Sequence, residues 1–153
     1  MILDHAAVTH PGRIRPTNED AIGSLVPERP DALRKRGAIF AVADGVGGHA
    51  AGEVASAMAI QDVMASYVSP TAPHAVEAAL TGAIQAANAR VHAIATGSDA
   101  DTRGMQTTLS VLVLCGRQSY VAHAGDSRIY RLRGATLSQL TADHSEAAEL
   151  VRL

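Results

Sequence analysis

Apolar residues fall into short runs in the first third of the chain, each bounded by proline, glycine or polar residues. Runs of this kind are typical of strands, and the pattern predicts strands over residues 6–10, 21–26 and 38–43. The polar, proline-containing segment 27–37 predicts a hairpin connection between the second and third of these strands.

The middle third has helical periodicity. Residues 53–68 are rich in Ala, Met, Val and Ile at helix-compatible spacing, and the proline-containing segment 69–73 ends this run. Apolar residues then recur three or four positions apart and predict a second helix over about residues 74–96, which Gly97 would end.

Short apolar runs return in the last third. They predict strands over residues 107–115, 119–124, 127–132 and 136–140, joined by glycine-containing turns. Asp143 and Glu146 have the spacing of a capping box, which predicts the start of a further helix. Strands, two helices and strands again indicate an α+β domain with largely antiparallel sheets.

Composition narrows the class of protein. At 153 residues with 47% hydrophobic content, the chain has the length of one domain and can bury a core. A net charge of -2, with no basic cluster larger than residues 34–36, argues against nucleic acid as a partner. The apolar runs are too short to span a membrane, and no signal-peptide pattern is present. The single cysteine, Cys115, is expected in the core of a cytoplasmic protein.

The strongest chemical signal is the position of Asp44. An apolar strand ends at this residue and opens into a glycine-rich turn that leads to a helix. The flexible backbone lets the Asp44 carboxylate and the Gly45 carbonyl both approach a hard cation. This arrangement predicts a metal site.

A second candidate group lies closer to the N-terminus, where Arg15 precedes the adjacent carboxylates Glu19 and Asp20. An arginine offers a planar fork for a phosphate dianion, and the carboxylates offer hard oxygens for Mg²⁺ or Mn²⁺. Taken alone, this segment favours a solvated polar turn, and only the presence of Asp44 gives it weight as a functional group.

Five motifs occur together in the order and spacing of the metal-dependent serine/threonine protein phosphatases of type 2C, and the chain resembles the bacterial members in particular. The motifs are Arg15 with residues 18–20, and the segments 40–53, 107–108, 125–130 and 140–145. The match covers nearly the whole chain.

The resemblance implies a fold and an activity. In that family, two antiparallel sheets pack face to face as a β-sandwich flanked by helices, in α-β-β-α layers, and two Mg²⁺ or Mn²⁺ ions lie at one end. The implied reaction is hydrolysis of phosphoserine and phosphothreonine by a metal-activated water, with phosphorylated proteins, the targets of a serine/threonine kinase, as partners. Arg15 would clamp the substrate phosphate.

The resemblance also implies the metal ligands. Asp44 would bridge the two ions, and Gly45 would bind one of them through its carbonyl. Glu19 and Asp20 would act on the ions directly or through water. Asp126 matches an acidic position that in bacterial relatives helps to hold a weaker third ion.

Departures from the family pattern set the alternatives. The family continues into strands that carry Asp-Gly-Leu and Asp-Asn motifs, and these have no counterpart among the 153 residues. We therefore expect a single type 2C domain over residues 1–153 whose C-terminal part is missing, with an exposed sheet edge open to self-association. Val46 occupies the position at which some relatives carry a histidine proposed as a general acid, and we do not transfer this role to His49. Gln106 occupies a position at which bacterial relatives commonly have glycine.

Two functions remain open from the sequence. The first is a metal-dependent protein phosphatase. The second is a catalytically silent phosphatase-like module that binds a phosphoprotein, a kinase or a second copy of itself. A nucleotide-binding interpretation of the glycine turn fails, because residues 45–50 lack the Lys-Ser/Thr of a phosphate-binding loop.

Overall fold

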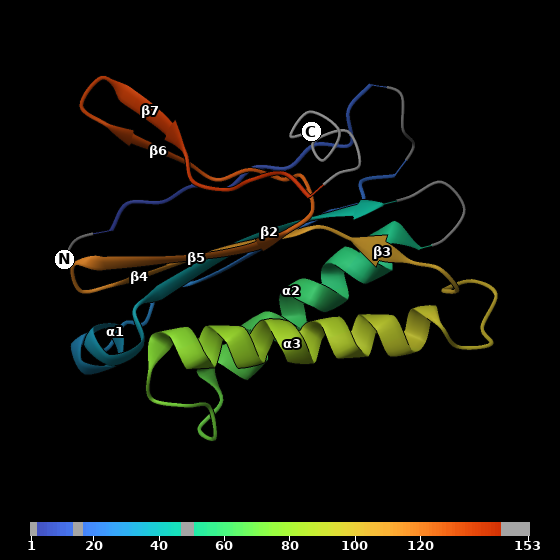
Figure 1. Ribbon diagram of the computed structural model, residues 1–153, viewed down its shortest axis with the longest axis horizontal. Coiled ribbons are helices and arrows are strands. Elements are labelled where there is room, and N and C mark those ends of the chain that lie inside the picture. Colours follow the sequence, from blue (N-terminus) through green and yellow to red (C-terminus); the bar gives the residue numbers. More distant parts are fainter. Residues whose placement is uncertain (1–2, 14–16, 47–50, 145–153) are drawn as a thin grey trace, which may run out of the picture.

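An antiparallel sheet with two long helices against one face makes up most of the computed structural model, which describes residues 3–13, 17–46 and 51–144 (Figure 1). The elements follow in chain order: β1 (Asp20–Leu25), α1 (Pro30–Arg36), β2 (Ala38–Val46), α2 (Gly52–Val68), α3 (Val76–Ala95), β3 (Gln106–Thr107), β4 (Leu109–Cys115), β5 (Gln118–Ala124), β6 (Tyr130–Arg133) and β7 (Thr136–Gln139). The α+β class with antiparallel sheets, as expected from the sequence, is confirmed.

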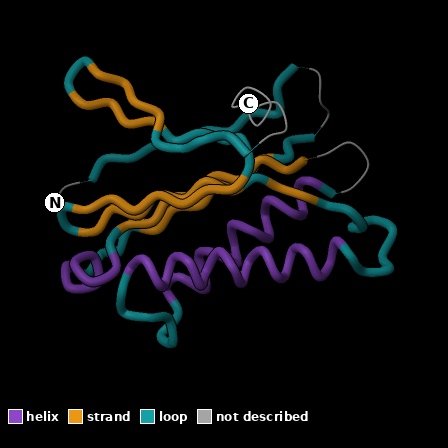
Figure 2. Tube along the Cα trace, in the orientation of Figure 1, coloured by secondary structure: helices purple, strands orange, loops and turns teal. Residues whose placement is uncertain are grey.

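The main sheet has the strand order β1-β2-β4-β5, with β3 added to the end of β2. Figure 2 shows the strands of this sheet along one side of the two long helices. Every pairing is antiparallel. The apolar strands β2 and β4 occupy the centre, where Ala41 pairs with Val111. The second sheet of the described residues is the two-stranded hairpin of β6 and β7, which lies on the side of the main sheet opposite α2 and α3.

The core lies between the sheet and the helices. Along β2, Ile39, Ala41 and Ala43 are buried against the helices, while the alternate residue Val42 is 45% exposed. This alternation has the period of two that an extended strand imposes. The residues of β2 at even positions, Asp44 included, therefore face away from the helices.

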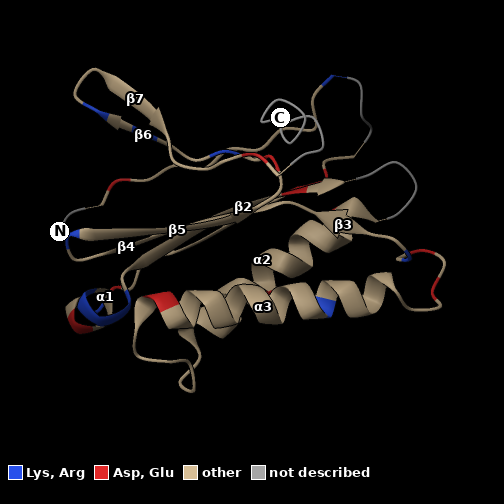
Figure 3. Ribbon diagram, in the orientation of Figure 1, with Lys and Arg blue, Asp and Glu red and all other residues tan. Residues whose placement is uncertain are grey.

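Charged side chains are sparse on the long helices (Figure 3). Basic residues gather in the last turn of α1, where Arg34, Lys35 and Arg36 interact favourably with the negative end of the helix dipole. Within the described ranges, no helix combines the length and the apolar character that crossing a bilayer requires.

The two long helices confirm the predicted ones within two residues at each end. The connection predicted over 27–37 instead contains α1, which begins with Pro30, a residue whose fixed φ suits the first helical position. The strand predicted over 6–10 is wrong: this segment is exposed and forms no ladder. Instead of strand pairing, the segment makes a side-chain hydrogen bond, in which the Thr9 hydroxyl accepts from the Asn18 amide at 2.8 Å.

Three further predictions at the C-terminal end change in detail. The strand predicted over 107–115 is interrupted at Thr108, and the one over 127–132 begins only at Tyr130. Cys115 is half-buried at the edge of the core, with its Sγ atom 3.4 Å from the Arg34 carbonyl oxygen. Of the predicted capping box, Glu146 lies outside the described residues, and Asp143 forms an ion pair with Arg128.

Tyr67 provides a test of the helix–sheet packing. Its side chain is fully buried, and its hydroxyl donates a 2.6 Å hydrogen bond to the Arg36 carbonyl oxygen. Burial, reinforced by the neighbouring Cys115, raises the pKa of Tyr67 from 10.0 to about 12. The neutral phenol therefore contributes its full stability below pH 10, and this contribution is lost as the pH rises through about 12.

We expect Tyr67→Phe to lower the free energy of unfolding by about 1–2 kcal/mol near neutral pH, because the Arg36 carbonyl loses its donor. Above pH 10, the difference between the wild type and the variant should shrink, since only the wild type has this phenol to ionise. Urea denaturation at a series of pH values measures both effects. A difference that stays constant up to pH 12 would contradict the buried, hydrogen-bonded phenol.

Candidate metal centre

Asp20 and Asp44 lie directly opposite each other at one end of the sheet. The register of β1 against β2 pairs these two residues, followed by Ile22 with Val42 on the same face. Side chains at directly opposite positions have Cβ atoms about 4.5–5.5 Å apart. Both aspartates are exposed, so this end of the sheet presents two carboxylates side by side, and a divalent cation between them would stabilise the arrangement.

Gly45, the next residue, lets the start of α2 approach β2 closely. A Cβ atom at this position would overlap the carbonyl oxygen of Gly52 and lie 2.8 Å from that of Glu19. The Gly45 amide donates to the Glu19 carbonyl oxygen at 3.0 Å, and the buried Ser56 hydroxyl donates to the same oxygen at 2.6 Å. The backbone of Glu19 is therefore held by β2 and α2 together.

Thr108 fixes the backbone of Asp44. The Asp44 amide donates to the Thr108 hydroxyl at 3.0 Å, and the Thr108 amide donates to the Asp44 carbonyl oxygen at 2.9 Å. Thr107 adds a hydroxyl hydrogen bond of 3.1 Å to the same carbonyl. These hydrogen bonds give residues 107–108 a structural role, because they anchor the backbone of the residue that presents the carboxylate.

Asp126 lies in the turn between β5 and β6 and is exposed. The preceding Gly125 has φ 101° and packs against Thr108, where a Cβ atom would come within 2.7 Å of the Thr108 methyl group. The hydroxyls of Ser127 and Thr108 are 2.8 Å apart. The turn that carries Asp126 is therefore attached to the same threonine that holds Asp44.

The same turn is tied to the segment that follows β7. Arg128 forms a bidentate ion pair with Asp143, with Nη2 2.6 Å and Nε 2.9 Å from its carboxylate oxygens. Hydrogen bonding to Arg128 lowers the pKa of the Asp143 carboxyl below its ordinary value. This pair links residues 15 positions apart, and no periodicity in the sequence predicted it.

The donor set has the chemistry of a site for a hard divalent cation. It consists of carboxylates and a main-chain carbonyl, which suit Mg²⁺ or Mn²⁺, and it contains no thiolate or imidazole. The set is partial: among the described residues, no three His, Cys, Asp or Glu side chains are grouped closely enough to hold a metal ion. Arg15 and His49 lie outside the described residues.

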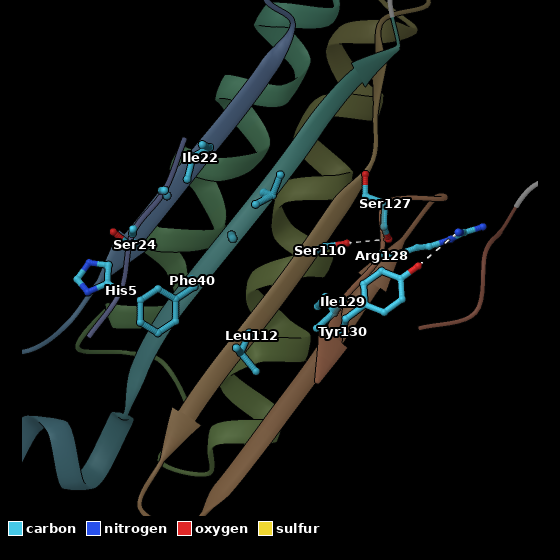
Figure 4. A pocket seen from close by; sticks show the side chains of 15 residues that line it. His5, Ile22, Ser24, Phe40, Ser110, Leu112, Ser127, Arg128, Ile129 and Tyr130 are labelled. Atoms are coloured by element: carbon cyan, nitrogen blue, oxygen red, sulfur yellow. Dashed lines mark hydrogen bonds between the residues drawn. The ribbon is translucent and has the colours of Figure 1, made fainter. Parts of the chain in front are cut away.

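An apolar groove of about 350 Å³ runs along the same face of the sheet (Figure 4). Phe40 and Leu112 from the sheet line it, together with Ile129 from the turn before β6 and Tyr130 at the start of β6. The His5 ring packs on Phe40 with ring centroids 5.3 Å apart. The face of the sheet that carries Asp20 and Asp44 thus continues into an apolar surface.

The fold and the carboxylate pair together describe an α+β domain with two aspartates side by side at the end of an antiparallel sheet. Residues 18–152 match the family model for protein phosphatase 2C. The chain therefore belongs to the protein phosphatase 2C family, as the resemblance implied.

Named relatives of the chain are bacterial phosphatases. The serine/threonine phosphatase stp of Listeria welshimeri is 42% identical over 147 residues, which cover 94% of this chain and 56% of that protein. The protein phosphatase PhpP of Streptococcus pneumoniae is 34% identical over 152 residues, which cover 98% of this chain and 58% of that protein. The chain spans little more than half the length of these relatives.

A solved structure agrees with these relatives. The crystal structure of the catalytic domain of the serine/threonine protein phosphatase PstP, in complex with two manganese ions, matches with a TM-score of 0.73 at 35% identity. The match covers 92% of this chain and 56% of that one. The similarity thus extends to a phosphatase that binds a pair of divalent metal ions.

Proposed function

We propose that this chain acts in the metal-dependent hydrolysis of phosphoserine and phosphothreonine in proteins. The observation that carries the proposal is the in-register pairing of Asp20 with Asp44 on the exposed face of the sheet. The names of the relatives, a protein phosphatase and a serine/threonine phosphatase, support the reaction class.

The proposed roles follow the donor set. Asp44 would hold both of two Mn²⁺ or Mg²⁺ ions, and Gly45 would contribute its carbonyl oxygen. Glu19 and Asp20 would bind the ions directly or through water, and Asp126 would help to hold a weaker third ion. Such ions, when bound, bring the pKa of a coordinated water close to neutral and so supply a nucleophile for in-line attack on phosphorus.

The protein side of the site contributes rigidity. Because Thr108 holds both the amide and the carbonyl of Asp44, that carboxylate is presented from a fixed backbone. Arg15 is proposed to bind the phosphate through its planar fork, which matches two phosphate oxygens. The substrates are proposed to be phosphorylated proteins, the products of a serine/threonine kinase.

The test is release of phosphate from p-nitrophenyl phosphate and from a phosphothreonine peptide. We expect hydrolysis that requires Mn²⁺ or Mg²⁺, disappears on chelation and returns when the ion is restored. Circular dichroism shows whether the protein is folded in each sample. A folded protein without metal-dependent release would contradict catalysis by this chain.

The apolar groove favours a second candidate function, a catalytically silent module that binds a phosphoprotein, a kinase or itself. Exposed apolar surface of this kind marks interaction sites. Sedimentation velocity combined with the hydrolysis assay separates the two functions. A monomer that turns over substrate would exclude the silent module, whereas self-association without turnover would favour it.

A further inference from the structure

We propose that the Arg128–Asp143 ion pair is a positioning device for Asp126, which holds the turn between β5 and β6 in the geometry that Asp126 needs to bind an ion. The inference rests on the proposed function, in which Asp126 contributes to metal binding. Neither Arg128 nor Asp143 touches the metal in this account, and both act through the turn.

The ion pair has the geometry of a rigid connection. Nε of Arg128 lies 2.9 Å and 3.1 Å from the two carboxylate oxygens of Asp143, and Nη2 lies 2.6 Å from the second. A planar guanidinium that binds both oxygens of a carboxylate fixes orientation as well as distance. The Gln139 amide supports the segment by donating to the Thr141 carbonyl oxygen at 2.8 Å.

Hydrogen bonds at the two ends of the turn run to the same segment as the ion pair. Before Asp126, the Gly125 carbonyl accepts from the His144 amide at 2.8 Å. After it, Ile129 accepts from the Leu140 amide at 2.8 Å and donates its own amide to the buried Thr141 hydroxyl at 3.2 Å. The segment 140–144 is therefore hydrogen-bonded to the turn on both sides of Asp126.

The other side of the turn is held by the sheet. Ser127 meets the Thr108 hydroxyl at 2.8 Å, and its carbonyl accepts from the buried Ser110 hydroxyl at 3.1 Å. Figure 4 shows Ser127 and Arg128 beside Ser110, with Arg128 extending away from the sheet. Asp126 is thus an exposed residue between neighbours that are anchored on two sides, and Asp143 provides the anchor on the side away from the sheet.

A positioning role differs from a purely structural one in what it changes. An ion pair as exposed as this one contributes little to folding stability, so its loss should leave the fold intact. Replacement of a group that orients a metal ligand, in contrast, typically lowers metal affinity by about 10–100-fold. Metal affinity is therefore the discriminating readout.

The experiment measures Mn²⁺ binding by electron paramagnetic resonance, using the signal of the free ion. Asp143→Asn should weaken the lowest-affinity Mn²⁺ ion by about tenfold. Arg128→Lys keeps the charge but loses the fork, and it should weaken the same ion to a smaller extent. Asp143→Asn should have no further effect in an Asp126→Asn background, because both changes act on one ligand.

A matched control is available in the helical layer. Arg90 and Asp62 form an ion pair of the same length, 2.6 Å, and the exposures of the two aspartates are nearly equal, 16% for Asp62 and 17% for Asp143. Asp62→Asn should leave Mn²⁺ affinity unchanged. The amide chemical shifts of residues 125–127 should change in Asp143→Asn and remain in place in Asp62→Asn, and this readout requires no metal.

Each outcome decides the inference. Wild-type affinity in Asp143→Asn, an equal loss in the Asp126→Asn background, or unmoved amide shifts would overturn the positioning role and leave the proposed function standing. A folded wild type that binds no Mn²⁺ would overturn the proposed function, and the inference with it. Weakening confined to one ion and dependent on Asp126 would support the proposal.

Discussion

Replacement of Asp44 by asparagine is expected to lower Mn²⁺-dependent phosphate release by more than about 100-fold. Loss of a group that merely orients a ligand costs up to about 100-fold in metal affinity or activity, and loss of a proposed bridging ligand should cost more. The amide has the shape of the carboxylate but lacks its charge. The backbone hydrogen bonds to Thr108 are retained, so the fold should be unaffected.

Asp101→Asn is the control for this variant, because Asp101 is an exposed aspartate in the turn after α3 and is subject to the same chemical change. Rates of p-nitrophenyl phosphate hydrolysis as a function of Mn²⁺ concentration measure both variants. The proposed role of Asp44 would be wrong if its variant kept a tenth or more of the wild-type rate with an unchanged Mn²⁺ requirement.

Gly45→Ala should destabilise the protein by about 3 kcal/mol or more. The added methyl group would overlap the Gly52 carbonyl, which belongs to the backbone and cannot move as a flexible side chain would. Either α2 or the end of β2 must shift, and the hydrogen bond from Gly45 to Glu19 would be strained by the movement. Urea denaturation measures the loss.

Gly82→Ala is the matched control for Gly45→Ala. Gly82 lies within α3, and a Cβ atom there would meet nothing within 4 Å. Because alanine favours a helix interior over glycine, this variant should gain up to about 1 kcal/mol in unfolding free energy. Opposite signs for the two glycine variants would support the close approach of α2 to β2, and a Gly45→Ala protein within about 1 kcal/mol of the wild type would contradict it.

Local signals predicted the elements that depend on local sequence. The helices α2 and α3 follow from apolar spacing and from the proline-containing segment between them. The segment 6–10 was predicted as a strand from its short apolar run, but strand formation requires a partner, and such a run carries no information about one. α1 was missed because seven residues are too few for a periodic pattern.

The same distinction applies to the candidate site. The apolar strand that ends at Asp44 and the glycines that follow it could be recognised in the sequence. The pairing of Asp20 with Asp44, in contrast, depends on the register between β1 and β2, which local composition does not determine. The contacts of Thr108 with Asp44 and of Arg128 with Asp143 are long-range side-chain interactions, and only the folded chain reveals them.

The most direct test of the account is anomalous diffraction at the manganese absorption edge from crystals of this chain soaked in Mn²⁺. We predict an anomalous peak between the strand partners Asp20 and Asp44, within about 2.5 Å of a carboxylate oxygen of Asp44. Bound Mn²⁺ elsewhere in the crystal, with no peak between these two carboxylates, would contradict the proposed metal site.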